Sequence, residues 1–106
     1  MVYTLKFHPE AQKEFLELDN GVRERVAKQL VKISMSPELG ENLGNRNGID
    51  LSGYRKMYAE KKKIRIVYEV IEEEILIHIM AIGARDDMTV YKTALKRLKE
   101  QNNKQE

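Results

Sequence analysis

The sequence of 106 residues contains no cysteine and only two histidines, His8 and His78. Without cysteine there is no disulfide framework and no thiolate metal site, and two histidines are too few for an ordinary zinc site. We therefore expect no metal or other cofactor. The absence of cysteine is typical of proteins in the reducing cytoplasm, which is where we expect this one.

Long apolar stretches are also absent. No window approaches the roughly 20 apolar residues of a membrane-spanning helix, and the N-terminus, MVYTLKFHPE, has neither a basic start nor a continuous apolar run. A chain of this length with 42% hydrophobic residues can form one core but not two. The composition predicts a soluble protein that is not exported and binds no membrane, with one domain over residues 1–100 and a polar tail over 101–106.

The net charge is only +2, but the charges are unevenly distributed along the chain. Residues 46–65 hold seven basic residues against two acidic ones, and four glutamates follow between residues 69 and 74. Such a cluster is either a solvated surface or a binding site for an anion such as nucleic acid. The basic residues are Arg46, Arg55, Lys56, Lys61, Lys62, Lys63 and Arg65.

The N-terminal part of the chain has the pattern of one strand followed by two helices. Residues 2–7 alternate as in a short, half-buried strand. Pro9 suits the first turn of a helix, and a second helix is expected to end at about Met35, before Pro37. Two apolar stripes predict a helical hairpin that covers one face of a sheet. They consist of Ala11, Phe15 and Leu18, and of Val22, Val26, Leu30 and Ile33.

The middle of the chain predicts three further strands, because β-branched residues recur there at two-residue spacing. They cover residues 54–59, 63–71 and 74–82, with tight turns near residues 60–62 and 72–73, and short turns make neighbouring strands antiparallel. Residues 37–53 are rich in glycine and predict a long connection without regular structure, which is either a linker or a functional segment.

A last amphipathic helix is expected over residues 87–101. The predicted fold class is therefore α+β. It is a small antiparallel sheet of about four strands, with the N-terminal helical hairpin packed on one face and a C-terminal helix.

The arginines among the three predicted strands over residues 54–82 are unusually placed, within strands or directly after them. If the side of the strand that carries Ile64 packs under the helices, Arg65 points to the opposite, open face, and we place Arg55 beside it. Arg85 and Tyr91 complete the patch. Guanidinium groups bind phosphate oxygens and stabilise the charge of a pentacoordinate phosphorus, and a phenol can exchange a proton. Each arginine could equally form a surface ion pair with one of the 17 acidic residues.

Six motifs together resemble the RelE branch of the RelE/ParE superfamily of bacterial toxins, over residues 2–98. The resemblance implies the fold predicted above. The motifs are Phe7, Ala11, Lys13 and Glu14 in the opening segment, VRERV at 22–26, SPxxG at 36–40, LxGYR at 51–55, IRIVY at 64–68, and IGxRxxxxVY at 82–91.

The resemblance implies the toxin of a toxin–antitoxin module, a ribosome-dependent endoribonuclease or mRNA interferase. Such a toxin cleaves mRNA in the ribosomal A site and so inhibits translation. With no metal ligands apparent, the nucleophile would be the 2′-hydroxyl of the RNA. Its partners would be the ribosome, with its mRNA and ribosomal RNA, and a cognate antitoxin, with which it forms an oligomer. The alternatives are a ParE-like inhibitor of DNA gyrase without nuclease activity and a catalytically weakened homologue that still binds antitoxin.

The resemblance also implies residue roles. Arg65 and Arg85 would hold the scissile phosphate, and Tyr91 would be the candidate base, because Met57 stands where we expect the family to carry a lysine on the second of the predicted strands. These three residues, Arg65, Arg85 and Tyr91, are the expected catalytic set. The expected RNA-binding residues are Arg55, Lys56, Arg46, Lys61, Lys62 and Lys63.

Overall fold

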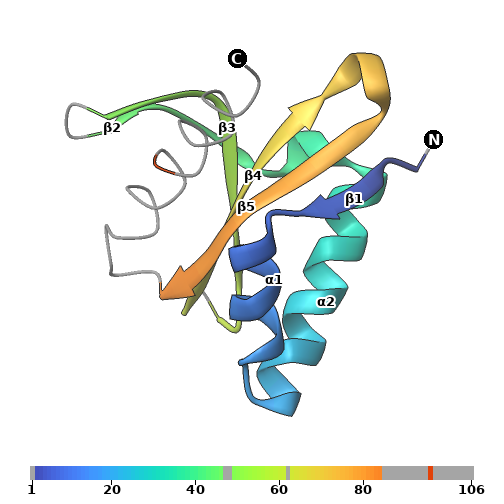
Figure 1. Cartoon of the computed structure of the whole chain (residues 1–106), viewed down its shortest axis with the longest axis vertical. Coiled ribbons are helices and arrows are strands. Elements are labelled where there is room, and N and C mark those ends of the chain that lie inside the picture. The colour runs from blue at the N-terminus through green and yellow to red at the C-terminus, as the bar shows by residue number, and fades with distance from the viewer. Residues whose placement is uncertain (1, 47–48, 62, 85–95, 97–106) are drawn as a thin grey trace.

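The computed structural model describes residues 2–46, 49–61, 63–84 and 96. In this part of the chain, two helices lie against one side of a five-stranded sheet (Figure 1). The strand order is β1-β5-β4-β3-β2, with β1 and β5 parallel and all other neighbours antiparallel. In chain order the elements are β1 (Thr4–Phe7), α1 (Pro9–Leu16), α2 (Asn20–Met35), the 3₁₀ turn η1 (Pro37–Leu39), β2 (Glu41–Arg46), β3 (Ile49–Ala59), β4 (Ile64–Ile71), the 3₁₀ turn η2 (Glu72–Glu74) and β5 (Leu76–Ala84).

The first helix begins and the second helix ends where the sequence predicts. Pro9 is the first residue of α1, and the imidazole Nδ1 of His8 caps the helix by accepting a hydrogen bond from the Glu10 amide at 3.2 Å. Helix α2 ends at Met35, just before Pro37. Both helix boundaries follow from local sequence because proline fixes the backbone where it stands.

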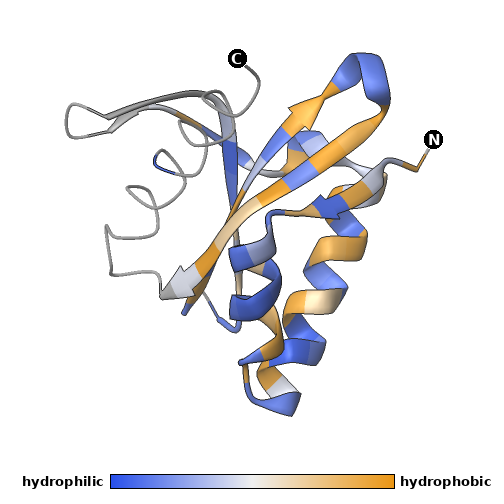
Figure 2. Ribbon diagram, viewed as in Figure 1, coloured by the Kyte–Doolittle hydropathy of each residue, from blue (hydrophilic) through white to orange (hydrophobic). Residues whose placement is uncertain are grey.

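The apolar stripes of the helices meet the apolar side of the sheet and form the main core (Figure 2). Every stripe residue predicted from the sequence belongs to this core or packs against it, which confirms that the helices cover one face. The fully buried members from the sheet are Ile66 and Tyr68 of β4 and Ile77 and Ile79 of β5, and those from the helices include Ala11, Val26 and Ile33.

The prediction that residues 37–53 lack regular structure was wrong. They contain η1, all of β2 and the first part of β3, and β2 pairs with β3 in an antiparallel hairpin. The sequence of β2, ENLGNR, has no β-branched residue, and the pairing is irregular between Asn42 and Gly44. Intrinsic preference does not explain this strand, so we attribute it to hydrogen bonding with β3.

The predicted sheet was also wrong in its number of strands and in being antiparallel throughout. The first strand, β1, lies at one edge and pairs in parallel with β5, from Thr4 with Leu76 to Phe7 with Ile79. A parallel neighbour requires a long crossover, and here everything from α1 to β4 lies between the two strands in sequence. The α+β class holds, but the sheet is mixed.

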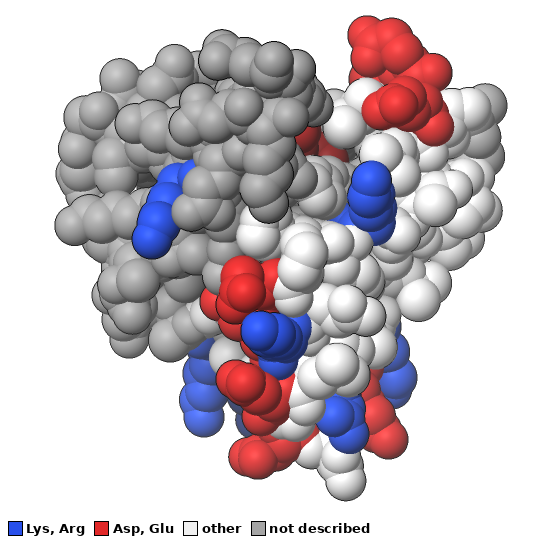
Figure 3. Space-filling model, viewed as in Figure 1, with Lys and Arg blue, Asp and Glu red and all other residues white. Residues whose placement is uncertain are grey.

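The two predicted tight turns are confirmed. Glu60 and Lys61 take left-handed backbone angles between β3 and β4, and η2 connects β4 to β5. The glutamates of η2 are exposed and form the acidic group at the tip of this hairpin in Figure 3, whereas basic and acidic side chains are interspersed over α1 and α2.

Two predictions concern the C-terminal part of the chain. Lys96 is helical, but the rest of the expected helix over 87–101 and the expected tail over 101–106 lie outside the described residues.

Among the described residues, none of the helices has the length and apolar character needed to cross a membrane.

Candidate functional site

The register between β3 and β4 decides which side chains share a face of the sheet. Tyr58 pairs with Arg65, and Lys56 pairs with Val67. Because directly paired residues point to the same side, Lys56, Tyr58 and Arg65 lie together on the face away from α1 and α2. Met57 alternates to the other side, where it packs against the main core.

The predicted position of Arg55 beside Arg65 was wrong. Arg55 pairs with Tyr68, a core residue on the helix-covered side. There its guanidinium Nη1 donates a hydrogen bond to the backbone oxygen of Gly40 at 2.6 Å. Alternation within each strand was predicted correctly, but the register between two strands was not, and an error of one residue moves a side chain to the opposite face. The same error explains why Met57 was expected at the site.

Two cations and one phenol form a cluster on the face away from the helices. Lys56 Nζ donates a hydrogen bond to the Tyr58 hydroxyl at 2.8 Å and lies 3.4 Å from the carboxylate of Glu41. The guanidinium carbon of Arg65 lies 5.7 Å from the centre of the Tyr58 ring. Hydrogen bonds with Lys56, which has the largest effect, and with Arg65 lower the pKa of the Tyr58 phenol. Burial raises this pKa, but by less.

Both cations of the cluster are buried, which is unusual for these residue types. The Lys56 and Arg65 side chains are each about 8% exposed. Burying a charge is costly unless an opposite charge accompanies it. Glu41 on β2 forms an ion pair with Lys56. A phosphodiester carries negative oxygens that match a guanidinium and an ammonium placed side by side. The arrangement therefore suits an RNA backbone.

The other end of this face favours neutral side chains. The Tyr54 hydroxyl is buried and has no hydrogen-bond partner among the described residues. Burial raises its pKa, and the nearby charge of Glu69 raises it further. Burial also raises the pKa of the Glu69 carboxyl. His78, which pairs with Glu69, has its pKa lowered by burial first and then by His8 and Lys6.

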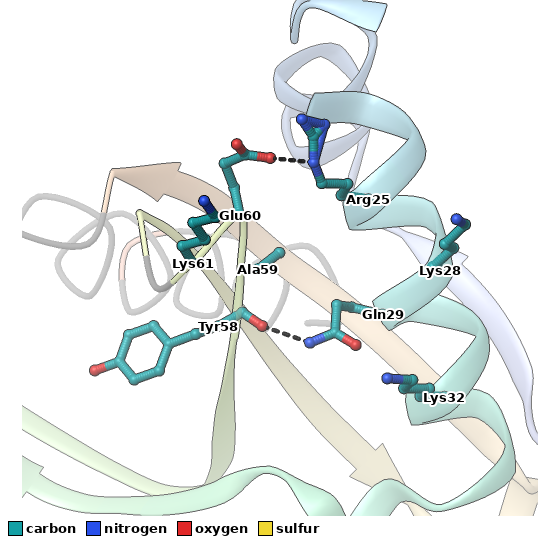
Figure 4. Close-up of a pocket in the computed structure, with 8 residues that line it drawn as sticks. All are labelled: Arg25, Lys28, Gln29, Lys32, Tyr58, Ala59, Glu60 and Lys61. Carbon is teal, nitrogen blue, oxygen red and sulfur yellow. Dashed lines mark hydrogen bonds and ion pairs between the residues drawn. The ribbon is translucent and has the colours of Figure 1, made fainter. Parts of the chain in front are cut away.

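A basic pocket of about 460 Å³ lies between α2 and the end of β3 (Figure 4). The Gln29 side chain donates to the backbone oxygen of Tyr58 at 2.7 Å, and Arg25 forms an ion pair of 2.8 Å with Glu60. The Tyr58 ring points away from α2, so the pocket and the cluster lie on opposite sides of the same strand (Figure 4). The basic residues that line the pocket are Arg25, Lys28, Lys32 and Lys61.

The structure places the remaining predicted site residues only in part. Lys63 is exposed, beside the turn between β3 and β4. Arg46 is the last residue of β2, and its side chain is not among the described parts of the chain. Lys62, Arg85 and Tyr91 also lie outside the described residues. Among the described residues, no group of three or more potential ligands is placed to hold a metal ion.

Sequence reasoning missed Tyr58 and the basic side of α2. Tyr58 could have been found because it stands two residues from Lys56 and therefore on the same side of the strand. Arg25, Lys28 and Lys32 recur at intervals of three and four residues, which is the spacing of one helix face.

Comparisons with known proteins find relatives in both sequence and structure. The family model described as "ParE toxin of type II toxin-antitoxin system, parDE" matches residues 5–88. The chain is 34% identical to "mRNA interferase toxin RelE" of Escherichia coli strain K12 over 101 residues, covering 92% of this chain and 99% of that protein. It is also similar to the structure of an E. coli RelE variant in the free state, with a TM-score of 0.75 and 31% identity over 92% of this chain and 98% of that one. A RelE variant in complex with a peptide of the antitoxin RelB gives a TM-score of 0.67 at 30% identity, covering 89% and 95% of the two chains.

Proposed function

The chain belongs to the ParE toxin family of type II toxin–antitoxin systems and is a RelE-like toxin, and we propose that it is an mRNA interferase. The observation that carries the proposal is the buried cluster of Lys56, Tyr58 and Arg65. Groups with perturbed pKa values cluster at functional sites, and phosphoryl transfer uses cations placed where negative charge develops.

In the proposed reaction the 2′-hydroxyl of the RNA attacks the adjacent phosphorus. The Arg65 guanidinium stabilises the extra negative charge on the pentacoordinate phosphorus, and Lys56 holds the same phosphate in place. Burial strengthens both interactions, because the local dielectric constant is lower than that of water. Arg85 and Tyr91 remain in the proposed catalytic set.

We place the cleavage on mRNA in the ribosomal A site, and therefore in the cytoplasm. The pocket between α2 and β3 would contact phosphates of ribosomal RNA through Arg25, Lys28, Lys32 and Lys61. Binding through several phosphate contacts weakens steeply as salt increases, so association with ribosomes should depend strongly on ionic strength. The further basic residues proposed for RNA contact are Arg46, Lys62 and Lys63. Arg55 is not among them, because it binds Gly40 on the other face.

A cognate antitoxin is the second proposed partner, as in the known complexes of RelE with RelB. The end of α2 and η1 present three large apolar side chains to solvent, Val31, Met35 and Leu39, each more than half exposed. Val31 and Met35 are four residues apart and lie on one helix side, which an amphipathic segment of the antitoxin can cover.

Induced expression followed by mapping of mRNA 5′ ends tests the proposed activity. An mRNA interferase that acts in the A site should produce cuts in phase with codons, and only in translated messages. Co-expression of the antitoxin should suppress these cuts. Intact messages together with DNA damage would instead favour the alternative of a ParE-like gyrase inhibitor.

A further inference from the structure

Cleavage by the 2′-hydroxyl requires a group that removes its proton. An ordinary tyrosine has a pKa near 10 and is a poor base at neutral pH, and an ordinary lysine is protonated there. A base at this site must therefore be a group whose surroundings favour its deprotonated form. Two positive charges beside a phenol provide such surroundings, because they stabilise the phenolate.

We infer that Tyr58 is the proton acceptor of the cleavage reaction, acting as a phenolate between Lys56 and Arg65; this inference rests on the proposed function. Tyr58 lies directly opposite Arg65 in the paired strands, and its hydroxyl is 2.8 Å from Lys56 Nζ. The group that takes the proton thus stands beside the group that holds the phosphate. The direction of the Tyr58 pKa, lowered by these two neighbours, agrees with this role.

The other titratable groups on this face fit the role less well. Lys56 is the hydrogen-bond donor to Tyr58, and its Nζ also lies 3.4 Å from the carboxylate of Glu41. Glu69 stands four residues from Arg65 along β4, which is about 13 Å in a strand. Tyr54 is likewise four residues from Tyr58, and burial raises its pKa, which makes its phenolate less accessible.

The Tyr58 phenolate oxygen takes the proton of the ribose 2′-hydroxyl, and the 2′-oxygen forms a bond to phosphorus. The bond between phosphorus and the 5′-oxygen breaks, and the leaving 5′-oxygen takes a proton from water. The products are a 2′,3′-cyclic phosphate and a 5′-hydroxyl, and Tyr58 returns its proton to water before the next turnover.

The test compares Tyr58→Phe with the matched control Tyr54→Phe in single-turnover cleavage of mRNA on purified ribosomes. Both substitutions remove one hydroxyl from the same side of β3 and keep the ring. Loss of a general base lowers the rate by about 10²–10⁴-fold, so this is the expected effect of Tyr58→Phe. Tyr54→Phe should cleave like the wild type. Thermal unfolding and antitoxin binding of both variants establish that they are folded.

The pH dependence separates a base from a residue that merely positions the RNA. The wild-type rate should rise with pH and reach a plateau as Tyr58 deprotonates. Lys56→Met removes the first cause of the lowered pKa, so the rise should move to higher pH whatever the absolute rate. In Tyr58→Phe this plateau should disappear, because the phenolate whose formation it reports is gone.

Three results would overturn the inference. If Tyr58→Phe cleaves at a rate within about threefold of the wild-type rate, Tyr58 is not the base, but the proposed function stands. A slow Tyr58→Phe variant that keeps the wild-type pH profile would assign Tyr58 to positioning instead. A wild-type protein that leaves ribosome-bound mRNA uncut would overturn both the inference and the proposed function.

Discussion

The two faces of the sheet formed by β3, β4 and β5 are both buried, but they bury different kinds of side chain. The side under α1 and α2 is almost entirely apolar, with Ile66 and Ile79 fully buried. The opposite side buries Lys56, Arg65 and His78. Since neighbouring residues of a strand alternate between these faces, a shift of one position changes a side chain from the core to the candidate site.

Within the same strands, one face therefore contributes mainly to stability and the opposite face to the proposed chemistry. Apolar burial stabilises the fold, whereas buried cations destabilise it unless something compensates for their charge. Proteins commonly keep such unfavourable groups where an activity requires them. Substitutions on the helix-covered face should therefore lower stability and spare the chemistry, and those on the other face should do the reverse.

The sharpest test of this separation compares Arg65→Met with Arg55→Met. Both replace a strand arginine by an apolar side chain of similar length. Removing the group that stabilises transition-state charge should lower the cleavage rate by about 10²–10³-fold in Arg65→Met. Arg55→Met should retain cleavage and lose only the hydrogen bond to Gly40. Single-turnover cleavage and thermal unfolding give both quantities, and an equal loss of cleavage in the two variants would contradict the assignment of faces.

A second test uses Met57→Lys, with Met57→Leu as its control. Met57 packs against the main core, so an ammonium there should lower the free energy of unfolding by about 1–3 kcal/mol without raising cleavage. Leucine conserves the volume and should cost less than about 1.5 kcal/mol. Urea unfolding measures both. Faster cleavage by Met57→Lys would mean that this lysine reaches the RNA and that the register is not as described.

A third test concerns Gly40, whose backbone lies against both β3 and β4. A Cβ atom at this position would lie 2.0 Å from the Tyr68 hydroxyl, which donates to the Pro37 backbone oxygen, and 3.0 Å from the Lys56 backbone oxygen. Gly40→Ala should therefore destabilise the protein by about 1–3 kcal/mol through overpacking. In Gly21→Ala the added Cβ meets only the flexible Arg25 side chain, so the free energy of unfolding should change little or increase. Similar losses in both variants would argue against the close approach at Gly40.

The smallest expected effect is a pH dependence of stability from His78. Its pKa is lowered in the folded protein, mainly by burial, so the unfolded chain takes up a proton more readily. The stability contributed by neutral His78 is present above its unfolded pKa of about 6.5 and is lost as pH falls through the lower folded value. Urea unfolding at about pH 7.5 and about pH 5.5 should show a smaller loss in His78→Gln than in the wild type.

Glu69 contributes with the opposite sign, because its pKa is raised by burial. A raised carboxyl pKa makes folding more favourable as pH falls. This contribution of Glu69 is present in the wild type and in His78→Gln, so it cancels when their losses of stability are compared. An equal loss for wild type and His78→Gln would mean that His78 is not the group responsible.

Local patterns in the sequence were reliable where one segment could be read by itself. Pro9 and Pro37 marked helix boundaries, and the apolar stripes identified the side of each helix that is buried. Strand β2 could not be found in this way, because it has few strand-forming residues and lies in the sheet through its pairing with β3. The parallel pairing of β1 with β5 joins residues about 70 positions apart, and no local pattern records it.

The candidate site divides in the same way. The sequence alone pointed to Arg65 and to a cationic region around it, because an arginine inside an apolar strand requires an explanation. Only the tertiary structure decided that Lys56 and Tyr58, and not Arg55 and Met57, accompany Arg65. The physical reason is that alternation within a strand is a local property, whereas the register between strands is set by packing and hydrogen bonds with other segments.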